Sequence, residues 1–558
     1  MFIQLLLSSI LAYFVWSIVC LESNVRKARA MGVPFVRLPI DSNNVLWTIV
    51  QPHVWNIIDR LPFDWSLYPD FVRYSRRGWH YDDGSETHVR LGPVWALVTP
   101  VTIYLHFADP DAIHEIVTRR TDFVRPIKEY KLLEVYGPCI STAGWDNWAR
   151  HRKVLAAPFN EGTMRFVWVE SLRQAKGMLR SWTSTAETGI PSVQKDTRTL
   201  SLNVLASTGF RKSYDFHGSA DVAVDEVGTY RDSLQTVLDN IIPLMLIPYD
   251  ILAGPIMPKN WARIGNAGVA FKKYMLQMLE EETRALNEGK PGSGGIMTAF
   301  ATASGPKKEE PRKGLSIDEI CGNLFVINFA GHDTTANTLA FCMLLLAAYP
   351  EVQAWMSQEI NAVVKDTPVE EWDYKDLFPQ LKRCQAVLLE TLRVYPPVMA
   401  IPKRTSRTTQ TLKVGDQTLT IPPNVSTIMY IRAVQAHPKY WPDPYTWKPS
   451  RWILNAAPEL SPSVDQISAE ELLEPKQGTF LSWSDGPQNC PGRKFSEVEA
   501  VAVLACLFKG HRLHVKKESG EGEAEARQRA LKCTHDVDMV MLLRMAHADR
   551  VRLVCTEA

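Results

Sequence analysis

The segment that most constrains this chain is a short loop near its C-terminal end, Phe480-Leu-Ser-Trp-Ser-Asp-Gly-Pro-Gln-Asn-Cys-Pro-Gly-Arg-Lys-Phe-Ser496. Turn-forming glycines and prolines surround one cysteine, Cys490, and a run with helical character, Phe495 to Phe508, follows it. We therefore expect Cys490 to lie just before a helix N-terminus, where backbone N–H groups and the helix dipole favour negative charge. A cysteine in that position is held as a thiolate, which is the form that binds metals.

The surroundings of Cys490 indicate which metal centre it suits. A single thiolate with no CxxC motif and no clustered histidines makes a poor zinc site. It makes a good axial ligand for a haem iron, where the thiolate pushes electron density toward O–O cleavage. The alternative is that Cys490, like most cysteines outside disulfides, is a small buried hydrophobe. The nine cysteines of the chain show no paired spacing, which indicates a reducing compartment without a disulfide framework.

The loop resembles the cysteine-ligand loop of the cytochrome P-450 superfamily, in which an aromatic residue, a glycine, the cysteine and a second glycine recur at fixed spacing. This chain matches the pattern with Trp483, Gly486, Cys490 and Gly492. The sequence of the loop is most similar to that of members from filamentous fungi. Trp483 fills a slot that is usually Phe and keeps an aromatic wall against the sulfur. Gln488 fills a slot that is usually basic and pairs with a haem propionate, so this position keeps a hydrogen-bond donor but lacks the charge.

A capping-box pattern, Ser316-Ile-Asp-Glu319, predicts the start of a long helix that continues to about Tyr349. Inside it lies Ala330-Gly-His-Asp-Thr-Thr335. A glycine costs about 1 kcal/mol relative to alanine in a helix, and a buried aspartate needs a partner. Residues that disfavour a helix, placed inside a long apolar helix, indicate a functional site; a helix kink with a solvated aspartate is the alternative.

The same segment resembles the oxygen-binding helix of the family. The resemblance implies that Ala330 and Gly331 leave room for dioxygen. It further implies that Thr334 steadies the activated oxygen and that Asp333 relays protons from solvent.

Two further motifs are expected to hold the cofactor. Trp148 and Arg152 are four residues apart and share one helix face, which on its own would be read as a solvated basic face. The resemblance implies that this helix packs on the haem edge and binds one propionate. On a small β region, Lys403, with Arg404 as the alternative, is expected to reach the second propionate.

A third set of residues is expected to be structural. Glu390 and Arg393 lie on a helix predicted over Leu381 to Tyr395, and Arg451 follows in an aromatic-x-Pro-x-Arg segment. The resemblance implies that the three form a triad that fixes the cysteine loop. A planar guanidinium suits such a bidentate cluster.

The N-terminal end predicts a membrane anchor. Phe2 to Leu21 is a run of twenty residues without a charge, long enough to cross a bilayer core. Basic residues follow directly, which by the positive-inside rule leaves the rest of the chain in the cytosol; a cleaved signal peptide is the alternative. We therefore expect a transmembrane anchor at residues 1–22, a basic, proline-containing hinge at 23–44 with a stiff segment over Gly32 to Pro39, and one haem-thiolate monooxygenase domain at 45–558.

Hydrophobic periodicity and turn residues predict the remaining elements. We expect a core helix over Leu46–Ile58, with a helix on the membrane surface as the alternative. The other expected elements are a hairpin within His88–Phe107, a helix starting at Asp109-Pro110, helices over Asn160–Leu286, an exposed loop over Gly289–Gly314, a β region at Thr411–Val414 and Gln417–Ile421, insertions at Asn455–Gly478 and Glu518–Ala530, and closing strands at Met539–Leu543 and Val551–Val554.

The motifs occur in the order found in the family, which implies a mainly α fold with a smaller β region, the cytochrome P-450 fold. The implied protein is a haem b monooxygenase that inserts one atom of O2 into a lipophilic small molecule, by hydroxylation or epoxidation, in a fungal secondary-metabolite pathway. The chain has no Rossmann glycine fingerprint, so electrons are expected from a separate NADPH–cytochrome P-450 reductase, with cytochrome b5 as a further donor. Arg493 and Lys494 are expected to contact the acidic face of the reductase, with simple solvation of the two side chains as the alternative. The implied location is the endoplasmic reticulum membrane.

Alternatives in other classes stay open at this point. A haem-thiolate enzyme can catalyse oxidative coupling, ring formation or rearrangement; rearrangement of peroxides needs no proton delivery, so the Asp333-Thr334 pair speaks against it. A non-catalytic haem carrier or sensor would have little use for that pair. A hydrolase with a nucleophilic cysteine needs a base near Cys490, and no histidine pattern points to one. The formal charge of +1 argues against nucleic-acid binding.

Overall fold

The computed structural model describes residues 2–63, 67–185, 187–210, 213–216, 230–290, 292, 294–303, 314–456, 463–539 and 541–558. The chain divides into two compact units. Unit 1 contains Met1–Pro126, Arg393–Trp447 and Pro475–Cys490, and unit 2 contains Ile127–Leu392, Lys448–Glu474 and Pro491–Ala558.

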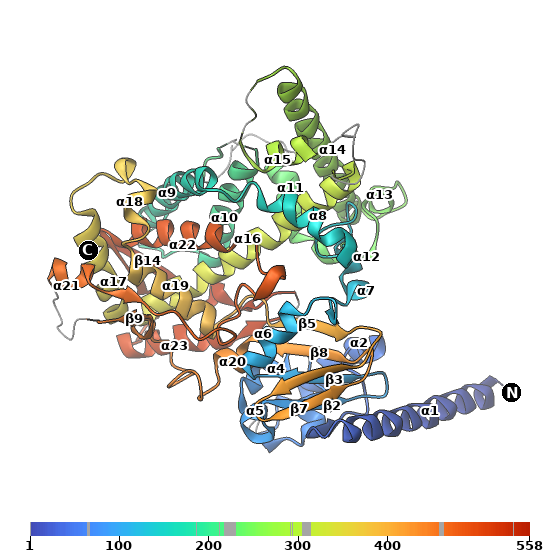
Figure 1. Cartoon of the computed structure of the whole chain (residues 1–558). Helices are drawn as coiled ribbons and strands as arrows, with labels where there is room; N and C mark the ends of the chain where they lie inside the picture. Colours follow the sequence, from blue (N-terminus) through green and yellow to red (C-terminus); the bar gives the residue numbers. More distant parts are fainter. Residues whose placement is uncertain are drawn as a thin grey trace. The chain divides into compact units, whose positions relative to one another are not determined.

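Unit 1 is built on a six-stranded sheet of order β1-β2-β3-β8-β5-β4 (Figure 1). Its strands are β1 Phe35–Arg37, β2 Val94–Val98, β3 Ile103–Phe107, β4 Phe123–Val124, β5 Ala400–Thr405 and β8 Ser426–Tyr430. The hairpin predicted within His88–Phe107 is confirmed as β2 and β3, with Val94 opposite Phe107. The second strand starts at Ile103, after a turn in which the Thr99 N–H donates a 3.0 Å hydrogen bond to the Thr102 carbonyl. A separate hairpin, β6 Gln410–Val414 with β7 Gln417–Ile421, confirms the predicted β region.

Short helices surround this sheet within unit 1. They are α2 Val45–Ile58, α3 Asp70–Arg73, α4 Trp79–Asp83, α5 Glu86–Leu91, α6 Pro110–Thr118 and α20 Ile431–Gln435. The predicted start of α6 is confirmed, since the Asp109 carboxylate accepts a 2.9 Å hydrogen bond from the Ala112 N–H and Pro110 fills the first helical position. The helix predicted as core at Leu46–Ile58 buries Trp55 but exposes Leu46, Ile49 and Ile57, so only part of α2 lies in the core.

The N-terminal helix α1, Phe2–Ala30, is longer than the predicted anchor and continues through the basic residues to Ala30 (Figure 1). The segment predicted as a stiff hinge contains β1, which pairs in parallel with β2; the Pro34 carbonyl accepts a 2.8 Å bond from the Ala96 N–H. Among the described residues, no single helix is long and apolar enough to cross a membrane; α16 and α17, bent by 108°, meet those criteria only as a pair.

Unit 2 is mainly helical. Four long helices pack against one another in it: α9 Glu161–Ser184, α10 Val193–Phe210, α16 Ile317–Ala348 and α22 Arg493–Phe508 (Figure 1). The capping box predicted at the start of α16 is confirmed, with Ser316 and Glu319 each bonding the other's backbone N–H. Most of α16 from Ile320 to Ala348 is buried.

The remaining helices of unit 2 confirm the helical prediction over the described part of Asn160–Leu286 and extend it; residues 186, 211–212 and 217–229 lie outside that part. These helices are α7 Ile127–Tyr130, α8 Trp145–Ala156, α11 Tyr230–Asp239, α12 Ile241–Leu246, α13 Tyr249–Leu252, α14 Lys259–Asn287, α15 Ile296–Ala303, α17 Pro350–Val364, α18 Tyr374–Leu377, α19 Lys382–Val394, α21 Val464–Ser468 and α23 Glu523–His535. The last residues of α19 belong to unit 1. The insertions predicted at Asn455–Gly478 and Glu518–Ala530 contain α21 and α23, and residues 457–462 lie outside the described part.

Two predictions in unit 2 are wrong. The loop predicted over Gly289–Gly314 contains α15, because Ile296, Met297 and Phe300 provide an apolar face that is buried in the core; residues 304–313 lie outside the described residues. The strand predicted at Met539–Leu543 is instead the turn of a hairpin between β12 Val537–Asp538 and β13 Arg544–Met545, with residue 540 not described. A short apolar run does not distinguish a strand from a turn by periodicity alone. The chain closes with β14 Leu553–Glu557, which pairs with β11 His511–Val515, and a short pair joins β9 Ile453–Leu454 to β10 Glu471–Leu472.

Candidate functional site

The cysteine loop in unit 1 is tightly wound. The Cys490 N–H donates a 2.8 Å bond to the Trp483 carbonyl, and the Asn489 N–H donates to the Gly486 carbonyl across a single 3₁₀ turn, η5 Gly486–Gln488. Ser484 and Gly486 have φ angles of +63° and +67°. A Cβ on Gly486 would lie 3.0 Å from the carbonyl oxygen of Val117, so the loop needs glycine there both for its backbone conformation and for space.

Cys490 differs from the other cysteines in its exposure. All nine fall in the described part of the chain, and Cys490 is the one classed as exposed, whereas seven are buried. Burial raises the pKa of the Cys342 and Cys506 thiols to about 12, which keeps them protonated and poor ligands. The interpretation of Cys490 as a buried hydrophobe is therefore wrong. Gly492 is the N-cap of α22, which begins at Arg493, so the predicted position just before a helix N-terminus is confirmed.

A buried cation lies next to this loop. Lys403 on β5 is 4% exposed, and its Nζ donates a 2.5 Å bond to Oε1 of Gln488. Burial, with a smaller effect of the Arg125 charge, lowers the pKa of the Lys403 ammonium to about 8. The positive charge that Gln488 lacks is thus present on a strand 85 residues away in sequence. A buried ammonium of lowered pKa suits an anionic partner such as a carboxylate of a cofactor.

In unit 2, the predicted oxygen-binding residues form an accessible patch on a mostly buried helix. Ala330 is exposed, and Gly331 and Thr334 are partly exposed. The Thr334 hydroxyl donates a 2.7 Å bond to the Ala330 carbonyl, and the Thr338 hydroxyl donates a 2.8 Å bond to the Thr334 carbonyl. A Cβ on Gly331 would lie 3.3 Å from Leu205 of α10, so this glycine lets α10 approach closely.

Asp333 is held in an ion-pair network that the sequence did not indicate. Arg198 of α10 donates from Nε to Asp333 at 2.9 Å, and its Nη2 lies 3.0 Å from the carboxylate of Asp239 on α11. Asp333, Arg198 and Asp239 line a cavity of about 600 Å³. Asp333, the expected proton relay, is therefore a carboxylate that is paired with Arg198 and also borders a cavity of mixed polar and apolar lining.

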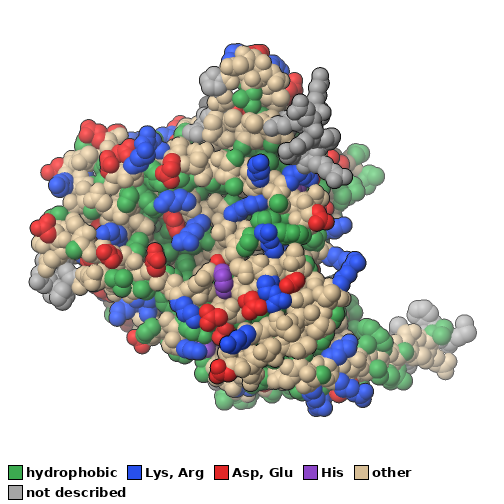
Figure 2. Space-filling view, viewed as in Figure 1, with side chains coloured by type: hydrophobic (Ala, Val, Ile, Leu, Met, Phe, Trp, Pro, Cys, Tyr) green, Lys and Arg blue, Asp and Glu red, His purple; other side chains and the backbone are tan. Residues whose placement is uncertain are grey.

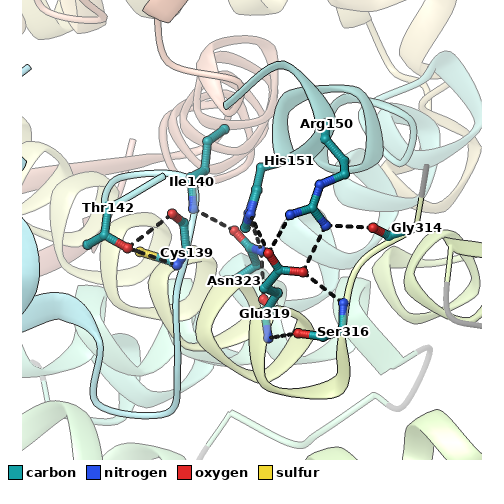
Figure 3. A network of polar contacts seen from close by, with 9 residues as sticks. All are labelled: Cys139, Ile140, Thr142, Arg150, His151, Gly314, Ser316, Glu319 and Asn323. Carbon is teal, nitrogen blue, oxygen red and sulfur yellow. Dashed lines mark hydrogen bonds and ion pairs between the residues drawn. The ribbon is translucent and has the colours of Figure 1, made fainter. Parts of the chain in front are cut away.

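The helix α8, predicted to pack on the cofactor, is fixed to α16 by a polar network (Figure 3). Arg150 forms a bidentate pair with Glu319, at 2.5 and 2.8 Å, and hydrogen bonding to Arg150 is the main cause that lowers the pKa of Glu319 to about 2. The buried His151 contacts Glu319 at 3.3 Å and Asn323 at 2.8 Å. Asn323 in turn accepts a 2.8 Å bond from the Ile140 N–H. The network holds α8 and the loop around Ile140 against the first turns of α16.

The two predicted cofactor residues on α8 flank this network. Trp148 is buried and stacks on Trp145 with a centroid distance of 5.3 Å, and Arg152 is partly exposed. Arg150 and His151 stand between them in sequence, but their partner Glu319 lies 169 and 168 residues away, so no local pattern could indicate the contact.

Of the predicted structural triad, the structure places Glu390 and Arg451 in contact. Arg451 Nε donates a 3.0 Å bond to Glu390, whose carboxylate also accepts from the Lys448 N–H and from Trp452 Nε1. Within unit 1, Arg393 is fully buried and donates to the carbonyls of Gln435, Pro444 and Thr446. These contacts anchor the segment that precedes the insertion.

The donor set fits a haem with one protein ligand better than a polydentate metal site. Among the described residues, no group of three or more His, Cys, Asp or Glu side chains could hold a metal ion. A haem-thiolate oxygenase needs an exposed cysteine ligand, and unit 1 provides Cys490 on a loop that contacts the buried Lys403. Such an enzyme also uses an alcohol beside a carboxylate, and α16 in unit 2 provides Thr334 and Asp333.

Comparisons with known proteins agree with that class. The sequence model of the family "Cytochrome P450" matches residues 67–535. A cytochrome P450 monooxygenase of Arthrobotrys oligospora is 28% identical over 96% of this chain and 95% of its own length, and one of Postia placenta is 31% identical over 75% and 77%. A phomenoic acid biosynthesis cluster cytochrome P450 monooxygenase of Leptosphaeria maculans is 25% identical over 88% and 89%.

The chain therefore belongs to the cytochrome P450 family and is a monooxygenase of fungal type. Its fold is mostly helical with a smaller sheet region, as predicted from the sequence. Membership implies a cysteine-ligated haem, a redox partner and a lipophilic substrate.

Proposed function

We propose that Cys490 is the axial ligand of a haem b and that the enzyme inserts one atom of O2 into a C–H bond or a double bond of a lipophilic small molecule. The observation that carries this proposal is the exposure of Cys490 on its wound loop, while seven of the other cysteines are buried. When bound, a haem with a thiolate ligand supplies oxygen activation that consumes two electrons and two protons.

The residues around the cofactor would hold its two propionates. Lys403 with Gln488 provides a buried, charge-assisted donor pair in unit 1. Trp148 and Arg152 provide an indole N–H and a guanidinium in unit 2, on a helix fixed by the Arg150–Glu319 pair. Trp483 lies partly exposed on the cysteine loop, where it would shield the sulfur from water.

Thr334 and Asp333 would deliver protons. Because the Thr334 hydroxyl donates to the Ala330 carbonyl, its lone pairs are available to accept a bond from a water or a protonated oxygen. Asp333 would pass protons from the adjoining cavity, and Arg198 would hold its carboxylate in place.

The variant Thr334→Ala tests this role. With the reductase and a substrate present, we expect NADPH consumption to continue while product per NADPH falls, because the hydroxyl that would help to pass protons is gone. Full coupling of NADPH to product in this variant would overturn the assignment. If the enzyme instead rearranged peroxides, which needs no proton delivery, the wild type and Thr334→Ala would give the same product yield.

Electrons would come from an NADPH–cytochrome P-450 reductase, with cytochrome b5 as a further donor. Arg493 and Lys494 at the start of α22 are the proposed contacts. The Arg493 side chain is 62% exposed and pairs with Glu497 at 3.0 Å. Charge reversal at Arg493 should slow reduction more at low salt than at high salt, as measured by stopped-flow absorbance.

The pathway and location are proposed on similar grounds. The name of the Leptosphaeria maculans relative supports a role in secondary metabolism, which deletion of the gene followed by comparison of extracted metabolites would test. The α1 helix exposes apolar side chains, among them Leu5, Leu11 and Trp16. Figure 2 shows apolar side chains on the surface of this helix. They support a membrane anchor, which would lie in the endoplasmic reticulum and leave the catalytic domain in the cytosol. Release of the full-length chain from membranes by alkaline carbonate would overturn the anchor.

A further inference from the structure

The short helix α6 contacts the segment of unit 1 that leads to Cys490 near both ends of that segment. At its N-terminal end, Gly478 packs so closely that a Cβ there would overlap the Pro110 carbonyl oxygen. At its C-terminal end, Gly486 packs on the carbonyl of Val117. Between these two backbone contacts, the His114 side chain reaches the segment that leads to Cys490.

His114 contacts both ends of the segment that leads to Cys490. Its Nδ1 lies 2.8 Å from Oδ2 of Asp485 and 2.9 Å from Nε2 of Gln477, and its Nε2 lies 3.4 Å from the same amide nitrogen. A carboxylate only accepts, so Nδ1 carries the proton toward Asp485. The Gln477 amide, whose shorter contact is to that same nitrogen, packs against the edge of the ring.

Asp485 connects His114 to the backbone of the cysteine loop. Its other oxygen accepts a 2.7 Å bond from the Gly486 N–H, at the start of the 3₁₀ turn. Cys490 closes the same loop through its N–H bond to Trp483. The side chains of His114 and Asp485 are 38% and 24% exposed, so the bond is partly shielded from solvent.

We propose that His114 is a positioning residue for the cysteine ligand: through Asp485 and Gln477 it holds the loop on α6 and so sets the orientation of the Cys490 sulfur. This inference rests on the proposed role of Cys490 as the haem ligand. His114 does not touch the cofactor in this account, and its effect reaches the sulfur through the loop backbone.

The test compares two substitutions at one position. His114→Asn keeps a donor near the place of Nδ1, whereas His114→Leu keeps bulk and removes it. The readouts on the purified haem-loaded, full-length protein are the haem reduction potential and the rate at which the carbon monoxide complex of the reduced protein loses its thiolate-type Soret band. In the Leu variant we expect a shifted potential and a loss of the band that is faster by about tenfold, the factor that a hydrogen bond to a charged group typically contributes. The Asn variant should stay close to the wild type in both readouts.

A matched control lies on the same helix. Asp111 pairs with Lys476 at 3.1 Å, but both side chains are highly exposed, so Asp111→Asn should leave both readouts unchanged. If His114→Leu does not fold, Asp485→Asn tests the same bond from its other side and should shift the potential in the same direction. The proposal is overturned if His114→Leu matches the wild type, or if His114→Asn is as strongly altered as His114→Leu. A wild-type protein without a thiolate-type band would instead overturn the proposed role of Cys490.

Discussion

At the scale of single residues, the contact between Lys403 and Gln488 changes how the cysteine loop is understood. In sequence, Gln488 departs from the basic residue usual in the family, which suggests a weakened cofactor site. In the structure, the buried ammonium of Lys403 on β5 donates a hydrogen bond to the Gln488 side chain. Lys403, the strand cation expected to meet a propionate, therefore also contacts the side chain at the uncharged position of the loop.

The positive charge can be removed from position 403 and returned at position 488. Lys403→Met should speed the loss of haem by roughly tenfold or more, because a charge-assisted bond to a propionate is removed. The double variant Lys403→Met with Gln488→Arg should recover most of the loss, since it returns the cation to the loop. Haem transfer to a scavenging globin, followed by absorbance, measures both rates.

The exposed Lys413 on β6 supplies the control, and Lys413→Met should lose haem at the wild-type rate. A double variant that loses haem as fast as Lys403→Met alone would show that the cation at position 403 acts in some other way.

At the scale of elements, the packing of α22 contains a buried acid. Glu499 is 1% exposed, and burial raises the pKa of its carboxyl to about 8, against a smaller lowering effect of Ser201 on α10. A carboxyl whose folded pKa exceeds its unfolded value of 4.5 favours folding below pH 4.5 and loses that stability as the pH rises through 8. At neutral pH the group therefore opposes folding.

Glu499→Gln should raise the free energy of unfolding by roughly 3 kcal/mol at pH 7 and leave it nearly unchanged at pH 4, because the amide stays neutral at both values. Denaturant titrations of the haem-loaded protein at the two pH values make the comparison. Glu497→Gln, which breaks the pair with Arg493, is the control and should show no gain at pH 7. A loss of stability in Glu499→Gln that is larger at pH 7 than at pH 4 would show that Glu499 is ionised and partnered.

The sequence predicted the elements of the site better than their contacts. The start of α6 and the capping box of α16 follow from interactions within four residues, so local patterns indicated them. The pairs Arg198–Asp333 and Arg150–Glu319 join residues more than 130 positions apart, and nothing near either member marks the other. The loop predicted over Gly289–Gly314 failed for the opposite reason: its glycines and prolines outweighed the apolar face of α15.

At the scale of the whole molecule, unit 1 contains a buried group of histidines that limits the pH range of stability. His106 stacks between Trp95 and Tyr430, with centroid distances of 4.4 and 5.2 Å, and His80 stacks on Tyr430 at 4.3 Å. Burial lowers the pKa of His80 to about 3 and that of His88 to about 4, and lowers the pKa of His106 strongly. All three are neutral in the folded protein.

A histidine whose folded pKa lies below its unfolded value of 6.5 loses stability as the pH falls below 6.5, because the unfolded chain binds the proton more readily. Each of the three should contribute a loss of about 2 kcal/mol between pH 6.5 and pH 5. Unfolding midpoints across this range should therefore fall steeply, and His80→Phe should reduce the slope. The exposed His53 is the control, and His53→Gln should leave the slope as it is. An unchanged slope in His80→Phe would mean that His80 is protonated in the folded state.

The central claim is that Cys490 binds a haem iron as a thiolate. The most direct measurement is the carbon monoxide difference spectrum of the dithionite-reduced, full-length protein, compared with Cys490→Ser and with Cys506→Ser at a buried cysteine. The account predicts a strongly red-shifted Soret band in the wild type and in Cys506→Ser, and its loss in Cys490→Ser. A red-shifted band that survives in Cys490→Ser, or a wild-type band at the position of histidine-ligated haem, would contradict it.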